Sequence, residues 1–393
     1  MEIKNTYPFM GVVQRELWKI YHKRTLRFIT LIAPLLAFLL VAWIFSNNVP
    51  RDLPIAVVDD DHTALSRQIA RMVDATSIAA VNRNFNDLEA ARKAVENGSV
   101  EGVLYIPDET EKGILRGTSS KLALYINNAN IVKGGLISSG VRKALSTMSV
   151  GIKLQMQMKT GKTQDQAMSR VMPVQLRQVM LFNPYTSYSY YLTAGLLPVM
   201  LVVVVLLGTT YAIGDELYRG TGPQWIRSAG GNFPLALAGK LLPYTLIYFF
   251  WAQVMNLILF NYLGMPLRGN YHLILLGELL MIFSYQFFAI FMVAITSNLR
   301  LSLSLGTGYS MLGLTYSGLT FPIFGMSGFS QIAASIFPFT YWIKILISQS
   351  LRGEPAANGI MPMFSLWVFI IFGLMFVPRL RYMMLNRSRW GKI

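Results

Sequence analysis

Two short clusters of polar residues have the types that metal or phosphate chemistry requires. Residues 59–62 read DDDH, and clustered carboxylates could hold a metal ion. Because these acids follow an apolar segment and precede an amphipathic one, we favour a role at the start of a helix. Residues 160–163 read TGKT, like the end of a phosphate-binding loop, but that loop would need glycine where the chain has Met156. We predict no catalytic residue, no metal site and no nucleotide site of the chain's own.

A single acid, Glu278, interrupts an otherwise uncharged run of residues 273–297. An ionisable side chain in hydrocarbon is a candidate for function, here the attraction of a cationic substrate or the relay of a proton. The alternative is that Glu278 lies at headgroup depth or pairs with Lys344 or Arg268. We favour the alternative.

Residues 214–229, GDELYRGTGPQWIRSA, form a short polar elbow between two apolar runs. Gly220, Gly222 and Pro223 permit sharp turns, and the sequence PQWIRS predicts a short helix with proline in its first turn. The elbow pairs no nucleophile with a base and has no metal-ligand spacing. We interpret this helix as a handle that another protein moves, within a coupling segment of residues 214–234.

The runs around the elbow indicate an integral membrane protein. The chain is 53% hydrophobic and 14% charged, with a mean hydropathy of +0.43. Uncharged runs of about 18 residues can cross the hydrocarbon as helices. We predict six such helices, at Phe28–Phe45, Tyr188–Ile213, Leu241–Gly264, Leu273–Ser297, Leu301–Pro322 and Ile360–Pro378.

The net charge of +16 is explained by topology better than by nucleic acid. Residues 47–187 hold 17 Lys and Arg against 13 Asp and Glu, which leaves 18 basic and 6 acidic residues elsewhere. If the N-terminus is cytoplasmic, 15 of those 18 basic residues lie inside. Because Lys and Arg are retained on the cytoplasmic face, we expect both termini inside, a basic tail at residues 386–393, and no nucleic-acid partner.

The long segment between the first two spans, residues 47–187, predicts a separate extracytoplasmic domain. LPIAVVDDD, EGVLYIP and KLALYINN are typical of strands, and TALSRQIARMVDA is typical of an amphipathic helix. Asn86 and Glu89 predict a capping box at the start of a second helix. From Ile131 to about Arg177 the pattern is helical, and the whole indicates an α/β domain without disulfides, since the chain has no cysteine.

The first 27 residues predict an amphipathic helix ahead of the first span, which residues 28–46 form. Phe9, Val12, Val13, Leu17, Ile20 and Tyr21 share one side, and Arg15, Lys19, His22 and Lys23 share the other. One interpretation is an interfacial helix with its basic side toward lipid headgroups, and the other is a plain positively charged anchor. We also expect Tyr341 and Trp342 to lie in an outer aromatic belt.

Several of these motifs together resemble the ABC-2 type exporter permeases. The elbow is similar to that family's E-x-x-R-G-T segment, which forms the coupling helix that meets the ATPase subunit. The resemblance implies a coupling role for Asp215, Glu216, Arg219, Gly220, Thr221 and Trp225. Gly222-Pro223-Gln224 stands where the family usually has LEQL, which leaves the start of the helix open.

The resemblance continues to the end of the chain, through the last five predicted spans, residues 188–385. FPFTYWIKILISQSLRG, residues 337–353, is similar to the family's P-x-x-Y and L-R-G signature. Residues 317–327 resemble the broken turn where the family has short re-entrant helices at the outer face. The resemblance implies a re-entrant region at 317–353 that includes Pro322, Phe337, Pro338, Tyr341, Leu351, Arg352 and Gly353.

Taken together, the sequence predicts an α-helical membrane protein of six transmembrane helices with an N-terminal interfacial helix. The resemblance implies a permease subunit in a bacterial inner membrane that exports a drug-like or lipid substrate. Its implied partners are an ABC ATPase carrying ATP and Mg, a second permease copy or homologue, membrane lipid, and a periplasmic adaptor with an outer-membrane channel. An ion-coupled secondary transporter would need inverted repeats and several buried charges, and a membrane-anchored receptor would leave five spans unexplained.

Overall fold

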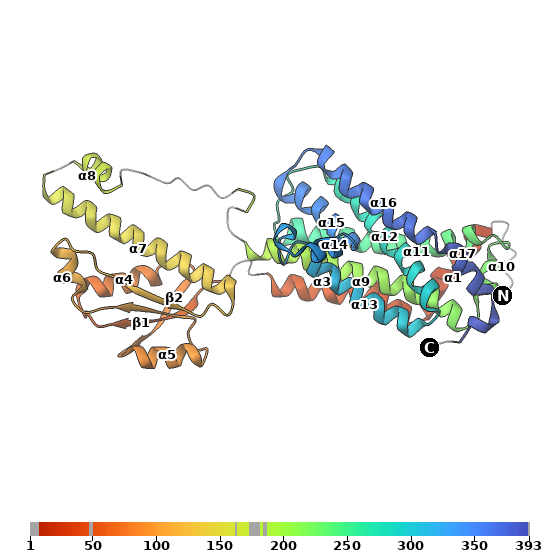
Figure 1. Ribbon diagram of the computed structural model, residues 1–393, viewed down its shortest axis with the longest axis horizontal. Helices are drawn as coiled ribbons and strands as arrows, with labels where there is room; N and C mark the ends of the chain where they lie inside the picture. Colours follow the sequence, from red (N-terminus) through yellow and green to blue (C-terminus); the bar gives the residue numbers. More distant parts are fainter. Residues whose placement is uncertain (1–7, 47–49, 162, 173–180, 184–186, 392–393) are drawn as a thin grey trace. The chain divides into compact units, whose positions relative to one another are not determined.

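The computed structural model describes residues 8–46, 50–161, 163–172, 181–183 and 187–391. The chain divides into two compact units. The helical unit comprises Met1–Asn48 and Met180–Ile393, and the inserted domain comprises Val49–Val179. Figure 1 shows both units.

The inserted domain is built on a four-stranded sheet in the order β2-β1-β3-β4. Its strands are β1 (Leu53–Asp59), β2 (Ala79–Phe85), β3 (Gly102–Ile106) and β4 (Ala123–Ile126). β1 pairs in parallel with β2 and β3, and β4 pairs antiparallel with β3. The three strands expected from the sequence are confirmed, and β2 is an additional strand that was not predicted.

Helices cover both faces of this sheet, as Figure 1 shows. One face packs against α4 (Ala64–Asp74) and α7 (Ile131–Lys159), where Ile55, Ile69 and Ile137 are buried. The other face packs against α5 (Leu88–Glu96), where Val58 and Ala91 are buried. Two shorter helices, α6 (Thr110–Leu115) and α8 (Gln164–Val171), complete the domain. The domain is a three-layer α/β structure.

Two predicted helix starts differ in detail from the structure. At α4 the N-cap is Thr63, which forms a capping box with Ser66. Asp59 accepts hydrogen bonds from the backbone N–H groups of the turn and from the Ser66 hydroxyl, so the acids shape the turn without capping the helix themselves. At α5 the N-cap is Asp87, so the prediction of Asn86 as the cap was wrong by one residue.

The helical unit consists of long helices joined by short turns. Its N-terminal part holds α1 (Pro8–His22), α2 (Arg24–Arg27), η1 (Phe28–Ile32) and α3 (Ala33–Ile44). Its C-terminal part holds α9 (Tyr188–Tyr218), α10 (Gly222–Ser228), α11 (Phe233–Asn256), η2 (Leu257–Tyr262), α12 (Tyr271–Thr296), α13 (Leu299–Tyr316), η3 (Ile323–Gly325), α14 (Gly328–Ala334), α15 (Pro338–Ile347), η4 (Ser348–Arg352), η5 (Ala356–Gly359), α16 (Ile360–Leu374), α17 (Val377–Leu385) and η6 (Arg387–Arg389).

Five helices in the described part of the chain are long and apolar enough to cross a membrane. They are Arg24–Ile44, Ser189–Tyr218, Phe233–Tyr262, Tyr271–Thr296 and Ala356–Leu385. A sixth is counted if the pair Gly328–Ala334 and Pro338–Arg352, bent by 82°, is one broken span. The expected span Leu301–Pro322 is not among them, because its helix α13 ends at Tyr316 and carries six Ser, Thr or Arg residues among its 18 residues.

Helices α9 and α12 lie at the centre of the helical unit. Leu197, Leu201 and Val205 of α9 are fully buried, as are Met281 and Ala289 of α12. The unit has opposite ends, with α1, α10 and α17 gathered at one and α14 and α15 at the other (Figure 1). The elbow lies at the first end, beside the N-terminal helix.

Candidate functional site

The elbow begins with two acids at the end of α9. Asp215 is 3% exposed and Glu216 is fully buried. A carboxylate at the C-terminal end of a helix is repelled by the helix dipole, and a buried one also loses its water. Both acids therefore need cationic partners inside the protein.

Glu216 is the centre of a cluster of charges that joins three helices. Arg15 of α1 donates to both carboxylate oxygens, at 2.8 and 2.9 Å, in the bidentate geometry that guanidinium favours. Lys240 of α11 donates to Oε1 at 2.9 Å. Lys19 of α1 and the hydroxyl of Thr221 also donate to Glu216. One carboxylate of α9 thus holds α1, α11 and the start of α10.

Lys240 extends this cluster further into the protein. Its side chain is fully buried and also contacts Oε2 of Glu16, 2.8 Å away and itself fully buried. The Nζ atom of Lys240 donates to the carbonyl of Ala212 at 3.2 Å and lies 4.8 Å from the centre of the Trp225 ring. Charges buried in this way are stable only when each one is paired, so the positions of α1, α9 and α11 depend on one another.

Asp215 forms a second group of ion pairs on the same helix end. Arg219 Nε donates to its Oδ1 at 2.8 Å, and Lys23 donates to its Oδ2. We refer to Arg15, Glu16, Lys19, Lys23, Asp215, Glu216, Arg219 and Lys240 together as the charge cluster. It contains three acids and five cations, so its net charge is positive.

Burial changes the acid–base properties of the α1 cations. Burial lowers the pKa of Lys19 from 10.5 to about 8, and the charge of Lys240 acts in the same direction. For Arg15 burial also favours the neutral form, but its hydrogen bonds and attraction to Glu216 are stronger and raise its pKa. Of Arg15 and Lys19, Lys19 is therefore the one that loses its proton at a pH of about 8.

Apolar packing fixes the elbow helix from the other side. Trp225 of α10 is fully buried, its Nε1 donates to the carbonyl of Ala236 at 3.1 Å, and its ring lies edge-on to Phe233. Gly220 has a φ of +67°, and a Cβ there would lie 2.7 Å from the Trp390 ring. At Gly222 a Cβ would lie 2.7 Å from the Met384 carbonyl. Only glycine fits at these two turns.

The structure places the predicted coupling residues in two groups. Asp215, Glu216 and Trp225 are buried, and Gly220 and Thr221 are half-buried. Arg219 is exposed, as are Gln224 and Arg227 on α10. The predicted short helix is confirmed, and it begins at Gly222 with Pro223 in its first turn. Arg219 pairs with Asp215, and Glu216 is fully buried.

Of the two interpretations of the N-terminal helix, the one that turns its basic side toward lipid headgroups was wrong. Arg15, Lys19 and Lys23 face the acids of α9 and not lipid headgroups. The exposed side of α1 includes Trp18 and Tyr21, which are 61% and 68% exposed. The sequence carried one signal that was missed: Glu16 lies between Val12 and Ile20 at helical spacing, on the buried side of the helix.

The signature near the C-terminus forms the second arm of the bent helix pair and ends in a turn. Pro338 opens α15 after Phe337, and Gly353 ends η4 with a φ of +65°. A Cβ at Gly353 would lie 3.0 Å from Arg268 Cβ, because the backbone at residues 268–270 pairs with this turn. This contact explains the glycine of the L-R-G motif.

The other predicted residues of this region lie around that turn. Pro322 precedes η3, Arg352 pairs with Glu354 at 2.9 Å, and Leu351 and Tyr341 are half-buried. Trp342 is fully buried, and its ring lies so close to Gly277 that a Cβ added there would be 3.1 Å away from it. Its predicted place in an aromatic belt was therefore wrong.

Glu278 lies fully buried on α12. Its Oε2 accepts a hydrogen bond from Gln253 at 3.0 Å, and Tyr271 donates to the same glutamine at 3.1 Å. The favoured pairing with Lys344 or Arg268 was wrong, since Lys344 lies over the ring of Tyr341 and Arg268 over that of Phe182. Oε1 of Glu278 and Oδ1 of Asn256 are buried without a donor among the described residues.

The acids of the DDDH cluster accept hydrogen bonds from neighbouring residues of the inserted domain. Asp60 accepts from the Tyr105 hydroxyl, and Asp61 accepts from Thr63 and from the backbone of Glu111. Within the described residues no three His, Cys, Asp or Glu side chains are placed to hold a metal. In the TGKT segment, Lys162 lies outside the described residues.

One protein-family model matches both the apolar helices and the inserted domain of the chain. The model of a family described as "ABC-2 family transporter protein" matches residues 23–377. The match covers the inserted domain and the helices from α2 to α16, and it begins after the α1 cations of the charge cluster. No curated protein matches the chain.

Proposed function

Because the chain belongs to the ABC-2 family of transporter proteins, we propose that it is the permease subunit of an ATP-driven exporter. A family member of this kind is a membrane component of a transporter and not itself catalytic. A separate ABC ATPase, which carries ATP and Mg, supplies the energy. The cargo is a hydrophobic or amphiphilic compound, drug-like or lipid, that leaves the cytoplasm or the inner leaflet.

The charge cluster is the observation that carries this proposal. Glu216 bonds to Arg15 on α1 and to Lys240 on α11 while it remains part of α9. A displacement of α10 therefore shifts the ends of three helices together, because separating any one of them would leave a buried charge unpaired. Such a block can pass the closure of an ATPase dimer to a two-state helical unit.

The contact surface for the ATPase is the exposed side of the elbow. Gln224 and Arg227 project from α10 into solvent, and Arg219 is exposed at the preceding turn. The buried residues Glu216 and Trp225 then transmit the force and do not touch the partner. This division of roles refines the coupling function assigned to the whole motif.

The arrangement of charge along the chain supports an orientation of the permease in the membrane. The excess of Lys and Arg at α1, the elbow and the C-terminus supports a cytoplasmic location for that end of the helical unit and for both termini. The inserted domain then lies on the outer side of the membrane, which in this proposal is a bacterial inner membrane.

The proposed transporter has further partners. A second permease, as a copy or a homologue, completes the transporter, and a periplasmic adaptor with an outer-membrane channel extends the export route.

Co-purification and transport with matched charge reversals test this function. The full chain is expressed with an ABC ATPase, solubilised, and captured by an affinity tag. We expect the ATPase to co-purify with the wild type and with Lys121→Glu, an exposed control in the inserted domain, and to be lost with Arg227→Glu. Capture that is equal in both variants, or cargo transport by the chain alone in proteoliposomes, would refute the proposal.

A second candidate function, ion-coupled transport, is favoured by one observation. Glu278 is a fully buried acid in α12 whose Oε2 accepts a hydrogen bond from Gln253. A protonophore added to proteoliposomes with ATP intact separates the two functions. Transport that collapses with the proton gradient supports ion coupling, and transport that continues supports the ATP-driven permease.

A further inference from the structure

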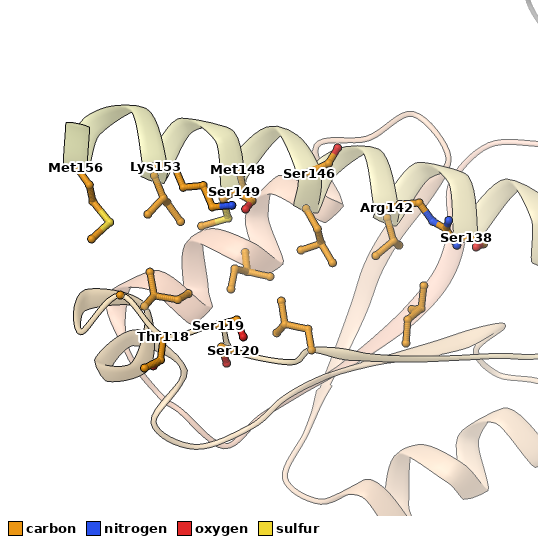
Figure 2. A pocket seen from close by; sticks show the side chains of 18 of the residues that line it. Thr118, Ser119, Ser120, Ser138, Arg142, Ser146, Met148, Ser149, Lys153 and Met156 are labelled. Atoms are coloured by element: carbon orange, nitrogen blue, oxygen red, sulfur yellow. The ribbon is translucent and has the colours of Figure 1, made fainter. Parts of the chain in front are cut away.

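The inserted domain contains a groove that the proposed coupling function does not use. It lies between α7 and the segment from Ile114 to Ile126, which includes β4, and its volume is about 690 Å³. Figure 2 shows the groove with α7 above it and Thr118, Ser119 and Ser120 on the opposite side. Pockets for small molecules commonly have volumes of roughly 300–1,000 Å³.

The inner wall of the groove is apolar on both sides. The sheet side is formed by Leu122, Leu124 and Ile126, and the helix side includes Leu145, Met148 and Ile152. These side chains belong to or pack against the core of this face of the sheet, so the wall is fixed by the fold. An alkyl chain that lies along this wall leaves water and gains the favourable free energy of apolar burial.

Polar groups follow the rim in a regular pattern. Ser138, Arg142, Ser149 and Lys153 of α7 all line the groove, and their spacing of four, seven and four residues places them on one side of the helix. Arg142 and Lys153 are exposed and form no ion pair with the described residues, while Lys133 of the same helix pairs with Glu101. Figure 2 shows the two cations near opposite ends of the groove.

The charged residues that line the groove have one sign. Helix α7 contains five Lys and Arg residues and no Asp or Glu. The residues that line the groove include two cations and six Ser or Thr hydroxyls but no acid. A cationic headgroup would meet repulsion here, whereas anionic oxygens would find charge-assisted donors.

We propose that this groove binds a single-chain amphiphile with an anionic headgroup, such as a long-chain carboxylate. The alkyl chain lies between α7 and β4, and the headgroup lies at the rim with Arg142 or Lys153 and the neighbouring hydroxyls. This site goes beyond the proposed function, because binding here needs neither the ATPase nor the elbow. It gives the inserted domain a role as a receptor for a lipid-like anion.

The test uses the full chain in nanodiscs of phosphatidylcholine. Since the chain has no native cysteine, Ser119→Cys provides a single rim position for an environment-sensitive fluorophore. Palmitate, hexadecyltrimethylammonium and octanoate are titrated below their micelle concentrations. We expect a saturable emission shift with palmitate. Hexadecyltrimethylammonium and octanoate should each bind at least roughly tenfold more weakly than palmitate.

Two double variants isolate the role of the rim cations. R142Q/K153Q removes both groove cations, and K143Q/K159Q removes two exposed cations of α7 that do not line the groove. We expect palmitate binding to weaken roughly tenfold in the first and to stay unchanged in the second, with equal thermal stability. Equal binding in both variants, a preference for the quaternary ammonium, or no saturable response to palmitate would overturn the proposal.

Discussion

Glu216 and Lys240 form an ion pair of 2.9 Å between α9 and α11, and both side chains are fully buried. The two residues are 24 positions apart in the sequence. Neither charge can reach water in the folded chain, so each one depends on the other and on Arg15, Lys19 and Glu16. This relationship makes the end of the helical unit one mechanical block.

Replacing Lys240 should destabilise this block strongly. Lys240→Met keeps the apolar stem but leaves Glu16 and Glu216 short of a partner, which costs about 3–5 kcal/mol for a broken buried pair. Lys121→Met, at an exposed position, should change stability by about 0.5 kcal/mol or less. Thermal unfolding in detergent measures both variants. Adding Glu216→Gln to the Lys240→Met variant should restore part of the lost thermal stability. If it does not, the two side chains are not coupled as described.

Gly220 should tolerate alanine less well than Gly231 does. Both have positive φ angles, +67° and +86°, so alanine is strained at each by about 1–2 kcal/mol. Only at Gly220 does a Cβ also meet the ring of Trp390, and Gly231 has nothing within 4 Å. The difference in unfolding temperature between Gly220→Ala and Gly231→Ala reports this contact. In a Trp390→Ala background the two should become equal, and a persisting difference would exclude Trp390 as the cause.

The stability contributed by Lys19 should rise with pH above about 8. Its pKa is lowered by burial and by Lys240 to about 8 in the folded chain, from 10.5. Between these pH values the unfolded chain holds more protons than the folded one, so stability from this group increases with pH. Below pH 8 both states are protonated and the contribution is constant.

A paired measurement isolates this titration from that of the other lysines. Unfolding temperatures of the wild type and Lys19→Met are compared from pH 7 to pH 10, with Lys143→Met as the exposed control. The difference between wild type and Lys19→Met should grow in favour of the wild type above pH 8. A difference that is flat with pH would contradict the lowered pKa of Lys19.

Glu278 should be replaceable by glutamine without loss of the fold. Glu278→Gln keeps an acceptor for Gln253, whereas Glu278→Ala leaves that amide without its partner and opens a cavity, at a cost of about 2–3 kcal/mol. Thermal unfolding distinguishes the two variants. Transport by Glu278→Gln then decides its role: a stable variant that transports normally excludes a proton relay, and a stable variant that does not transport supports one.

The local features of the fold were predictable because local sequence determines them. Pro223 and the glycines before it indicated a short helix in the elbow, and α10 begins there. The apolar segment LPIAVVD became β1. β2 was missed because AAVNRNF has few residues that favour strands, and its pairing with β1 creates the strand.

The charge cluster was not predictable in the same way. Arg15 and Glu216 are 201 residues apart, and their pairing depends on how α1 and α9 pack. The basic side of α1 suits lipid headgroups and buried acids equally well. Only the folded arrangement distinguishes the two, and it pairs the basic side with α9.

Cross-linking from α10 tests the central claim, that an ATPase grips the exposed side of the elbow, most directly. Gln224→Cys introduces the single thiol of the chain, and a short thiol–amine reagent is applied to membranes that contain the chain and an ABC ATPase. Lys121→Cys in the inserted domain is the matched control. We predict a cross-linked band from Gln224→Cys that contains the ATPase by mass spectrometry, and none from Lys121→Cys. A cross-link to the ATPase from position 121, with none from position 224, would contradict the account.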